Sequence, residues 1–262
     1  DVFAAQGLIS LNGAERTYIY DAEKKTDLPV IAIEATGTFL YDKGEEKAWK
    51  ALFKKFADKD VEKEAGRVGI IGMTPLSLSD LDAGEKITKI LKAEGYDKVS
   101  CYGMGSGLSE VKTAYAVEKN LVVSPAGMSV AKEMYEKAGI PYEVCDPLAL
   151  SFINDVLKEH DFSAKKVLII DQQVSAHSMR QVLKDRFSDC KVTVGNWFME
   201  AAELREDGDV SLREEDQFTE LVTEEGYDVI IGDRLLWDLI PDYKGLTIDK
   251  PHFALSGRLV TK

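Results

Sequence analysis

The chain has 262 residues, of which 45% are hydrophobic and 30% are charged, a composition typical of soluble globular proteins with one large domain or two of ordinary size. Its formal net charge of −13 argues against a nucleic-acid partner, because phosphate binding needs clustered Lys and Arg, and most simply indicates a solvated acidic surface. No apolar run approaches the roughly 18 residues of a membrane span, and no signal-peptide pattern opens the sequence, so no membrane association is expected.

The three cysteines, Cys101, Cys145 and Cys190, are far apart in the sequence. No pair has Cys-x-x-Cys spacing, so neither a zinc knuckle nor a disulfide framework is indicated. We therefore expect reduced thiols in a cytoplasmic protein. Cys101 is expected to be a buried, inert thiol; Cys145, at the domain junction, is expected to pack in the interior or to face the cleft; and Cys190 is expected to be structural or in contact with solvent. Because the first residue is Asp1 and not Met, a fragment, a processed chain or a trimmed chain is also expected.

The first half of the chain alternates between strand and helix patterns. After a lead-in at residues 1–27, the β-branched run at residues 28–34 predicts a strand, and residues 44–58 place Trp49 and Phe53 at helical spacing. Further strands are predicted at residues 68–71, 99–102, 121–123 and 142–145. Helices are predicted from Ser79 and Asp80 as N-caps, with Leu81 on the buried side, and then at residues 108–117 and 130–138. This alternation is typical of a parallel, doubly wound sheet.

The pattern restarts after Asp146 and Pro147. A bridging helix at residues 148–159 leads to predicted strands at residues 166–170, 191–194, 228–231 and 252–255, with helices at residues 175–187, 212–225 and 235–239. We therefore expect an α/β fold of two Rossmann-like domains, at residues 1–146 and 147–262, in which parallel sheets flanked by helices face each other over a cleft.

The loops after the predicted strands carry the candidate binding residues. Residues 103–109 and 124–127 are rich in Gly, Ser and Pro, and should lie side by side at the carboxyl ends of neighbouring strands, where open α/β sheets bind ligands. The loop after residue 170 should face them from the second domain. The candidate cofactor-binding residues in these loops are Gly103, Gly105, Ser106, Ser124, Gln172 and Gln173. The same residues are also typical of tight turns and helix caps, and no dinucleotide fingerprint, P-loop or catalytic triad accompanies them.

With these loops placed, the sequence resembles the nitrogenase component 1 family. That family contains the subunits of the molybdenum–iron protein, their cofactor-assembly scaffold relatives and the dark-operative protochlorophyllide reductase subunits. The resemblance covers roughly residues 28–256. Each of its motifs alone is a weak indicator of the family, and the resemblance rests on their order and spacing together. The motifs are Gly69-Ile70-Ile71-Gly72, Ser79-Asp80-Leu81, Gly103-x-Gly105-Ser106-x-x-Ser109-Glu110, Asn120-Leu121-Val122, Gly139-Ile140-Pro141-Tyr142, and the strand-and-loop steps at residues 166–171 and 228–233.

The ligand positions depart from the family pattern. In the nitrogenase α subunit, a cysteine four residues after the asparagine of the Asn-Leu-Val motif ligates the cofactor, and Ser124 stands there in this chain. The resemblance places the cofactor's histidine ligand within residues 251–256. Counting residues along the motif without gaps places this ligand position near Ser256, and Ser256 is therefore added to the candidate cofactor-binding residues. His252 is close by but falls where the last predicted strand begins. The family's bridging-cluster cysteines belong to an amino-terminal region that this chain is not expected to contain.

The resemblance implies an oxidoreductase domain in an iron–sulfur-dependent electron-transfer system. Its implied partners are a homologous subunit, in a homo- or heterodimer, and an ATP-dependent iron–sulfur reductase. An iron–sulfur or metal cofactor is implied only by the resemblance, since no cofactor ligands are identifiable in this chain, and we expect the chain alone to be inactive. The alternative is a cofactor-assembly scaffold, or a protein that binds an anion or tetrapyrrole in the cleft without redox activity. An unrelated nucleotide-sugar transferase is a third, weaker alternative.

Overall fold

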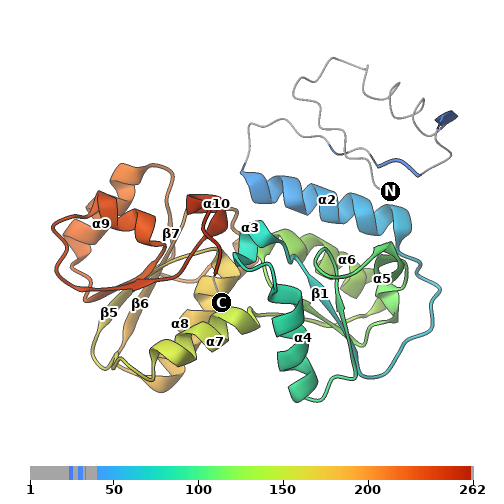
Figure 1. The fold of residues 1–262 in the computed structure, drawn as a ribbon, viewed down its shortest axis with the longest axis horizontal. Helices are drawn as coiled ribbons and strands as arrows, with labels where there is room; N and C mark the ends of the chain where they lie inside the picture. The colour runs from blue at the N-terminus through green and yellow to red at the C-terminus, as the bar shows by residue number, and fades with distance from the viewer. Residues whose placement is uncertain (1–23, 26–28, 32, 34–39, 261–262) are drawn as a thin grey trace.

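The computed structural model describes residues 24–25, 29–31, 33 and 40–260. Within the strand predicted at residues 28–34, the described positions belong to no helix or strand, and the others lie outside the described residues. Nearly all of the lead-in also lies outside them. Figure 1 shows two α/β units side by side, with α2 lying along one of them.

The first sheet consists of four parallel strands in the order β2-β1-β3-β4. The strands are β1 (Arg67–Ile71), β2 (Lys98–Cys101), β3 (Lys119–Val122) and β4 (Tyr142–Val144). Every residue of the inner strand β1 is buried, and Ile70 pairs with Cys101 on one side and Leu121 on the other. A strand that is covered on both faces reads as a continuous apolar run, which is why this strand was recognisable in the sequence.

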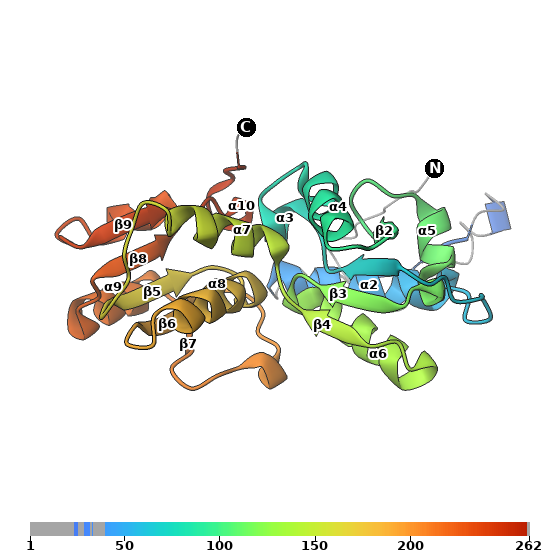
Figure 2. The ribbon, with the colours of Figure 1, turned by 90° about the horizontal axis from the view of Figure 1, so that it is seen from below.

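Helices cover both faces of the first sheet. One face carries α2 (Tyr41–Phe56), α5 (Leu108–Lys112), η1 (Ala114–Ala116), η2 (Pro125–Gly127) and α6 (Met128–Ala138), and the other carries α3 (Pro75–Leu78) and α4 (Ala83–Ala93). Figure 2 shows α4 and α6 on opposite sides of the strands. Trp49 and Phe53 of α2 share a core with Met134 of α6, whereas Ile87 and Leu91 of α4 pack in a separate core.

The second sheet consists of five parallel strands in the order β7-β6-β5-β8-β9. The strands are β5 (Lys166–Ile170), β6 (Lys191–Asn196), β7 (Val210–Ser211), β8 (Val229–Gly232) and β9 (Leu246–Asp249). The helical segments are α7 (Pro147–Val156), α8 (Gln173–Arg186), η3 (Ala202–Leu204), α9 (Glu215–Glu225), η4 (Arg234–Leu239) and α10 (Phe253–Ser256). Ile153 of α7 and Met179 of α8 pack on one face of this sheet, and Phe218 of α9 packs on the other.

The structure confirms the α/β fold with two parallel sheets flanked by helices, but the last predicted strand is wrong. The final strand is β9, and residues 252–255 instead cap and form the short helix α10. Strand β9 is an edge strand whose residues are mostly exposed, so it carries no apolar run. The apolar cluster at residues 252–255 reflects the packing of α10 against α3, where Phe253 N donates to Ser79 Oγ at 2.7 Å.

The predicted start of the second helix is also wrong. Ser79 ends α3 in the left-handed region with a φ of 58°, and α4 begins only after Asp82. Asp80 Oδ1 instead accepts from the backbone N–H of Asp82, and Leu81 is 64% exposed rather than buried. The helix predicted at residues 108–117 is divided into α5 and η1, and the bridging helix ends at Val156, before His160.

The carboxyl-terminal residues return to the first unit. The backbone N–H of Val260 donates to the carbonyl oxygen of Ser79 at 2.7 Å, next to the contact of Phe253 with the same residue. The carboxyl-terminal segment, which is distant in sequence from Ser79, therefore links the second unit to the first. Within the described part of the chain, no helix combines the length and the apolar character that crossing a membrane requires.

Candidate functional site

A direct hydrogen bond joins the loops at the carboxyl ends of β3 and β5. Gln172 Nε2 donates to the carbonyl oxygen of Val123 at 2.9 Å, although the two residues follow strands of different sheets. Gln172 is 2% exposed and also caps α8, because its Oε1 accepts from the backbone N–H of Val174. This candidate residue therefore lies at the boundary between the two sheets, where the loops after β3 and β5 meet, and its amide contacts protein on both sides.

Gln173 and Ser124 are buried beside this hydrogen bond and also contact the protein itself. The amide of Gln173 pairs with the backbone of Ala201, accepting from its N–H at 2.8 Å and donating to its carbonyl oxygen at 3.2 Å. Ser124 Oγ donates to the carbonyl oxygen of Gly72 at 2.6 Å. Gly72 has a φ of 84°, and a Cβ there would lie 2.6 Å from Ser124 Oγ, so the two loops fit together only with glycine.

Three ionisable side chains, Asp146, Asp171 and Lys250, meet in the interior at this boundary. Lys250 forms an ion pair with Asp171, and the side chains are 14% and 3% exposed. Asp146 caps α7 through the backbone N–H of Leu148 and accepts a second hydrogen bond from Ser175 Oγ. Burial alone would lower the pKa of Lys250, but the carboxylates of Asp171 and Asp146 outweigh it and raise that pKa. Lys250 is therefore a half-buried, protonated ammonium, while burial raises the pKa of Asp146.

The imidazole of His252 lies beside this group and stacks on the ring of Phe198. The ring centroids are 4.4 Å apart and the planes are inclined by 8°. His252 is 3% exposed, and neither ring nitrogen has a hydrogen-bond partner among the described residues. Its Nε2 lies 3.6 Å from Asp171 Oδ1, beyond hydrogen-bond distance. Burial lowers the pKa of His252 despite the nearby Asp171, so the imidazole is neutral at pH 7.

His252 lies in the loop beyond β9, where it caps α10, and not at the start of a strand as its sequence position indicated. Asp233 fixes this loop, because its Oδ2 accepts from the backbone N–H of His252 at 2.8 Å and from Ser256 Oγ at 2.6 Å. Asp233 Oδ1 also accepts from Arg258 Nη1 at 3.1 Å. Burial would raise the pKa of Asp233, but the hydrogen bonds from Ser256 and the backbone outweigh it and lower the pKa.

The candidate residues of the first glycine-rich loop line a different feature. Gly105 and Ser106 border a hollow of about 460 Å³ beside the edge strand β2, and Ser106 Oγ donates to the carbonyl oxygen of Cys101 at 2.5 Å. Gly103 has a φ of 87°, and a Cβ there would lie 2.7 Å from the ring of Trp49. This loop is thus built by close packing, and its residues are not among those that surround His252.

The three thiols do not converge. Cys101 contacts Thr88 and the carbonyl oxygen of Gly84, Cys190 packs in the core of the second unit, and Cys145 lines a hollow of about 310 Å³ between α4 and α7. Burial raises the pKa of each thiol, that of Cys145 to about 11. Within the portion of the chain that the structure describes, no three His, Cys, Asp or Glu side chains are arranged to hold a metal ion.

The comparisons with known proteins agree with this architecture. Residues 14–195 match the family model of the nitrogenase component 1 type oxidoreductases. The chain belongs to this family. Two solved structures, "Nitrogenase Cp1 at pH 6.5" and "Nitrogenase Cp1 at pH 5", resemble it with TM-scores of 0.66 at 11% and 14% sequence identity, and cover 90% and 93% of this chain. This chain spans 64% and 63% of the length of those chains, and at such identity the likeness shows the fold alone. No curated protein matches the sequence.

The residues at the boundary do not fit an iron–sulfur cluster held by this chain alone. Such clusters are held by several cysteine thiolates, and Ser124 stands where the resemblance places a cofactor-ligating cysteine. Its hydroxyl donates a hydrogen bond to the carbonyl oxygen of Gly72. The three thiols of the chain lie away from this loop, each in its own packing environment. His252 offers a nitrogen donor, but a single imidazole does not make a cluster site.

Sequence reasoning missed the central charged residues of this boundary. Asp146 and Asp171 directly follow the predicted strands that end at residues 145 and 170, and that position at the carboxyl end of a parallel strand is a usable signal. Lys250 and Phe198 gave no such signal. They reach the boundary through the loops after β9 and β6, which the sequence pattern did not place.

Proposed function

We propose that this chain is one subunit of a nitrogenase component 1-type reductase system, and that the boundary around His252 contributes to a site completed by a homologous subunit. Membership of the family supports the iron–sulfur-dependent electron-transfer role. The location rests on His252, a buried imidazole without a hydrogen-bond partner among the described residues, because such groups are rare unless a ligand or a function explains them.

The chemistry available at this boundary is electrostatic and acid–base. The protonated Lys250 provides a positive charge that stabilises a negative group on a substrate or cofactor, and it is a potential proton donor. The neutral His252 provides a nitrogen that accepts or donates a hydrogen bond. Because His252 is buried and Lys250 is mostly shielded from water, their interactions with a charged ligand are stronger than at the surface.

The chain is proposed to be inactive alone because its described residues do not converge as cluster ligands. The thiolates would come from the homologous subunit or from other segments, and the electrons from an ATP-dependent iron–sulfur reductase. The three free thiols are compatible with the cytoplasm as the site of this activity. The substrate class is a small molecule or metal cofactor, with no nucleic acid, given the charge of −13.

An electron-transfer assay tests this function. A reduced ATP-dependent iron–sulfur reductase is mixed with this protein alone, or with the protein co-purified with its homologous subunit, and oxidation of the reductase is followed by absorbance. Oxidation is expected only with both subunits, and more slowly with His252→Leu in an assembly of unchanged size. Fast oxidation by this chain alone contradicts the need for a partner, and no oxidation by the pair contradicts the redox role.

A scaffold or binding protein without redox activity is the second candidate, and Ser124 favours it. A hydroxyl at the expected cysteine position, bonded to Gly72, leaves an oxygen that is a poor iron ligand compared with a thiolate. Calorimetry of the iron-free protein with a tetrapyrrole distinguishes the two candidates. Saturable binding by the full chain without bound iron favours the scaffold, whereas the absence of heat counts against it.

A further inference from the structure

A hollow of about 280 Å³ lies between α2, η1 and α6, on the face of the first sheet opposite α4. Its apolar lining comes from Phe53, Tyr115, Val130 and Met134, each at most 7% exposed. These side chains belong to the packed core of the first unit, so the floor of the hollow is rigid. Its volume is just below the roughly 300 Å³ at which the range for small-molecule sites begins.

Lysines surround the mouth of this hollow. Lys54 is in the last turn of α2, Lys59 follows that helix, and Lys137 is in the last turn of α6. Lys137 forms an ion pair with Glu133, the one acidic side chain of the lining. Lys54 and Lys59 form no ion pair within the described part of the chain. Three lysines against one glutamate leave two positive charges in excess at the hollow.

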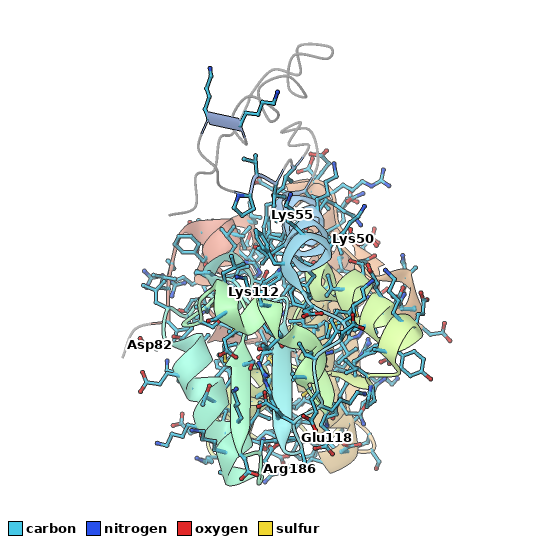
Figure 3. The ribbon with its side chains drawn as sticks, turned by 90° about the vertical axis from the view of Figure 1, so that its right-hand side faces the viewer. Lys50, Lys55, Asp82, Lys112, Glu118 and Arg186 are labelled. Atoms are coloured by element: carbon cyan, nitrogen blue, oxygen red, sulfur yellow. The ribbon has the colours of Figure 1, made fainter. Side chains whose placement is uncertain are left out.

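This concentration of positive charge is unusual for a chain with a net charge of −13. Ammonium groups held around one hollow repel each other unless an anion lies between them. Figure 3 shows Lys50 and Lys55 on α2 and Lys112 beside that helix. An aromatic and apolar floor below a cationic rim is complementary to a molecule with an apolar body and an anionic end.

We propose that the hollow between α2 and α6 binds a small organic anion, with its phosphate or carboxylate end among Lys54, Lys59 and Lys137 and its apolar body on Phe53 and Tyr115. Lysine ammonium groups bind phosphate as point charges, without the planar geometry that arginine imposes. The site is distinct from the boundary around His252, and it does not rest on the function proposed for that boundary.

Isothermal titration calorimetry of the full chain with phenyl phosphate at low ionic strength tests the proposal, with inorganic phosphate as the comparison. Saturable binding of one phenyl phosphate per chain is expected, tighter than that of inorganic phosphate because the ring contacts the apolar floor. The double variant Lys54→Gln/Lys59→Gln should weaken binding about tenfold through the loss of two charge contacts. Glu133→Gln should strengthen it by a few fold, because it removes the negative charge from the lining.

The matched control is Lys89→Gln/Lys92→Gln, which makes the same charge change on exposed positions of α4. Its affinity for phenyl phosphate should equal that of the wild type. The proposal is overturned by the absence of saturable heat, by an equal loss of affinity in the α4 control, or by weaker binding in Glu133→Gln. All three variants change exposed or half-buried side chains, and unchanged thermal unfolding midpoints confirm that the comparison is between folded proteins.

Discussion

Asp146 and Asp171 are buried carboxylates, and the ammonium of Lys250 lies where it opposes both of their charges. A buried charge is tolerated when it is paired and hydrogen-bonded, and it becomes costly once its partner is removed. The ion pair between Lys250 and Asp171 therefore stabilises the contact between the two sheets at this boundary.

Lys250→Met should destabilise the protein by roughly 3 kcal/mol, because it leaves two buried carboxylates without their counter-ion. Urea denaturation followed by circular dichroism measures this loss. Lys89→Met, an exposed change on α4, should alter the free energy of unfolding by less than about 0.5 kcal/mol. The double variant Lys250→Met/Asp171→Asn should recover part of this loss of stability. If its loss of unfolding free energy equals the sum of the losses in the two single variants, the two side chains are not coupled, and this would contradict the pairing.

His252 should make the protein sensitive to mild acid. Its pKa in the folded state is lowered by burial, so the unfolded chain binds the proton more readily, and stability falls as the pH drops below the unfolded value of about 6.5. His252→Phe, which keeps a ring on Phe198, should lose about 1 kcal/mol less than the wild type between pH 7.5 and 5.5. Equal losses in the two proteins would show that the pKa of His252 is the same in the folded and the unfolded chain, which contradicts its lowering by burial. His177, whose pKa is also lowered, is present in both and cancels.

At the scale of elements, the loops after β1 and β3 fit together through Gly72 and Ser124. Gly72→Ala should cost roughly 3 kcal/mol, because a Cβ at a φ of 84° would also lie 3.0 Å from the backbone nitrogen of Gly127. Gly105→Ala is the matched control, with a φ of 79° and open space around the added carbon, and should cost about 1 kcal/mol from backbone strain alone. Guanidinium denaturation that ranks the two variants in the opposite order would rule out this account of the loop packing.

The elements recognisable from the sequence are those whose pattern local physics dictates. Strand β1 reads as an apolar run because it is buried on both faces, and α6 ends at Gly139 because that residue adopts a φ of 63°. The pattern failed where tertiary contacts decide. Strand β9 is an exposed edge, and the left-handed conformation of Ser79 depends on its contacts with Phe253 and Val260, far along the chain.

At the scale of the whole molecule, the sequence predicted two parallel sheets and the family, and it identified Gln172 and Ser124 as residues of the loops that meet. It did not identify the ion pair of Lys250 with Asp171, because that contact joins loops whose positions only the packed fold determines. It also grouped Gly105 and Ser106 with the boundary, although they line the hollow beside β2. The sequence analysis expected the loops at residues 103–109 and 124–127 to follow neighbouring strands, but β1 lies between β2 and β3 and separates them. The sequence pattern gives the order of strands along the chain and not their order in the sheet, so the first glycine-rich loop was grouped with the wrong site.

We propose that the chain contributes His252 and Lys250 to a redox site whose cluster ligands come from the homologous subunit. Iron per chain, measured by elemental analysis after anaerobic purification, tests it most directly, first for this protein alone and then for its co-purified assembly with the homologous subunit. We predict less than stoichiometric iron and no visible cluster absorbance for the protein alone, and stoichiometric iron with such absorbance for the assembly. A full complement of iron in the isolated chain, retained in His252→Leu, would contradict the account.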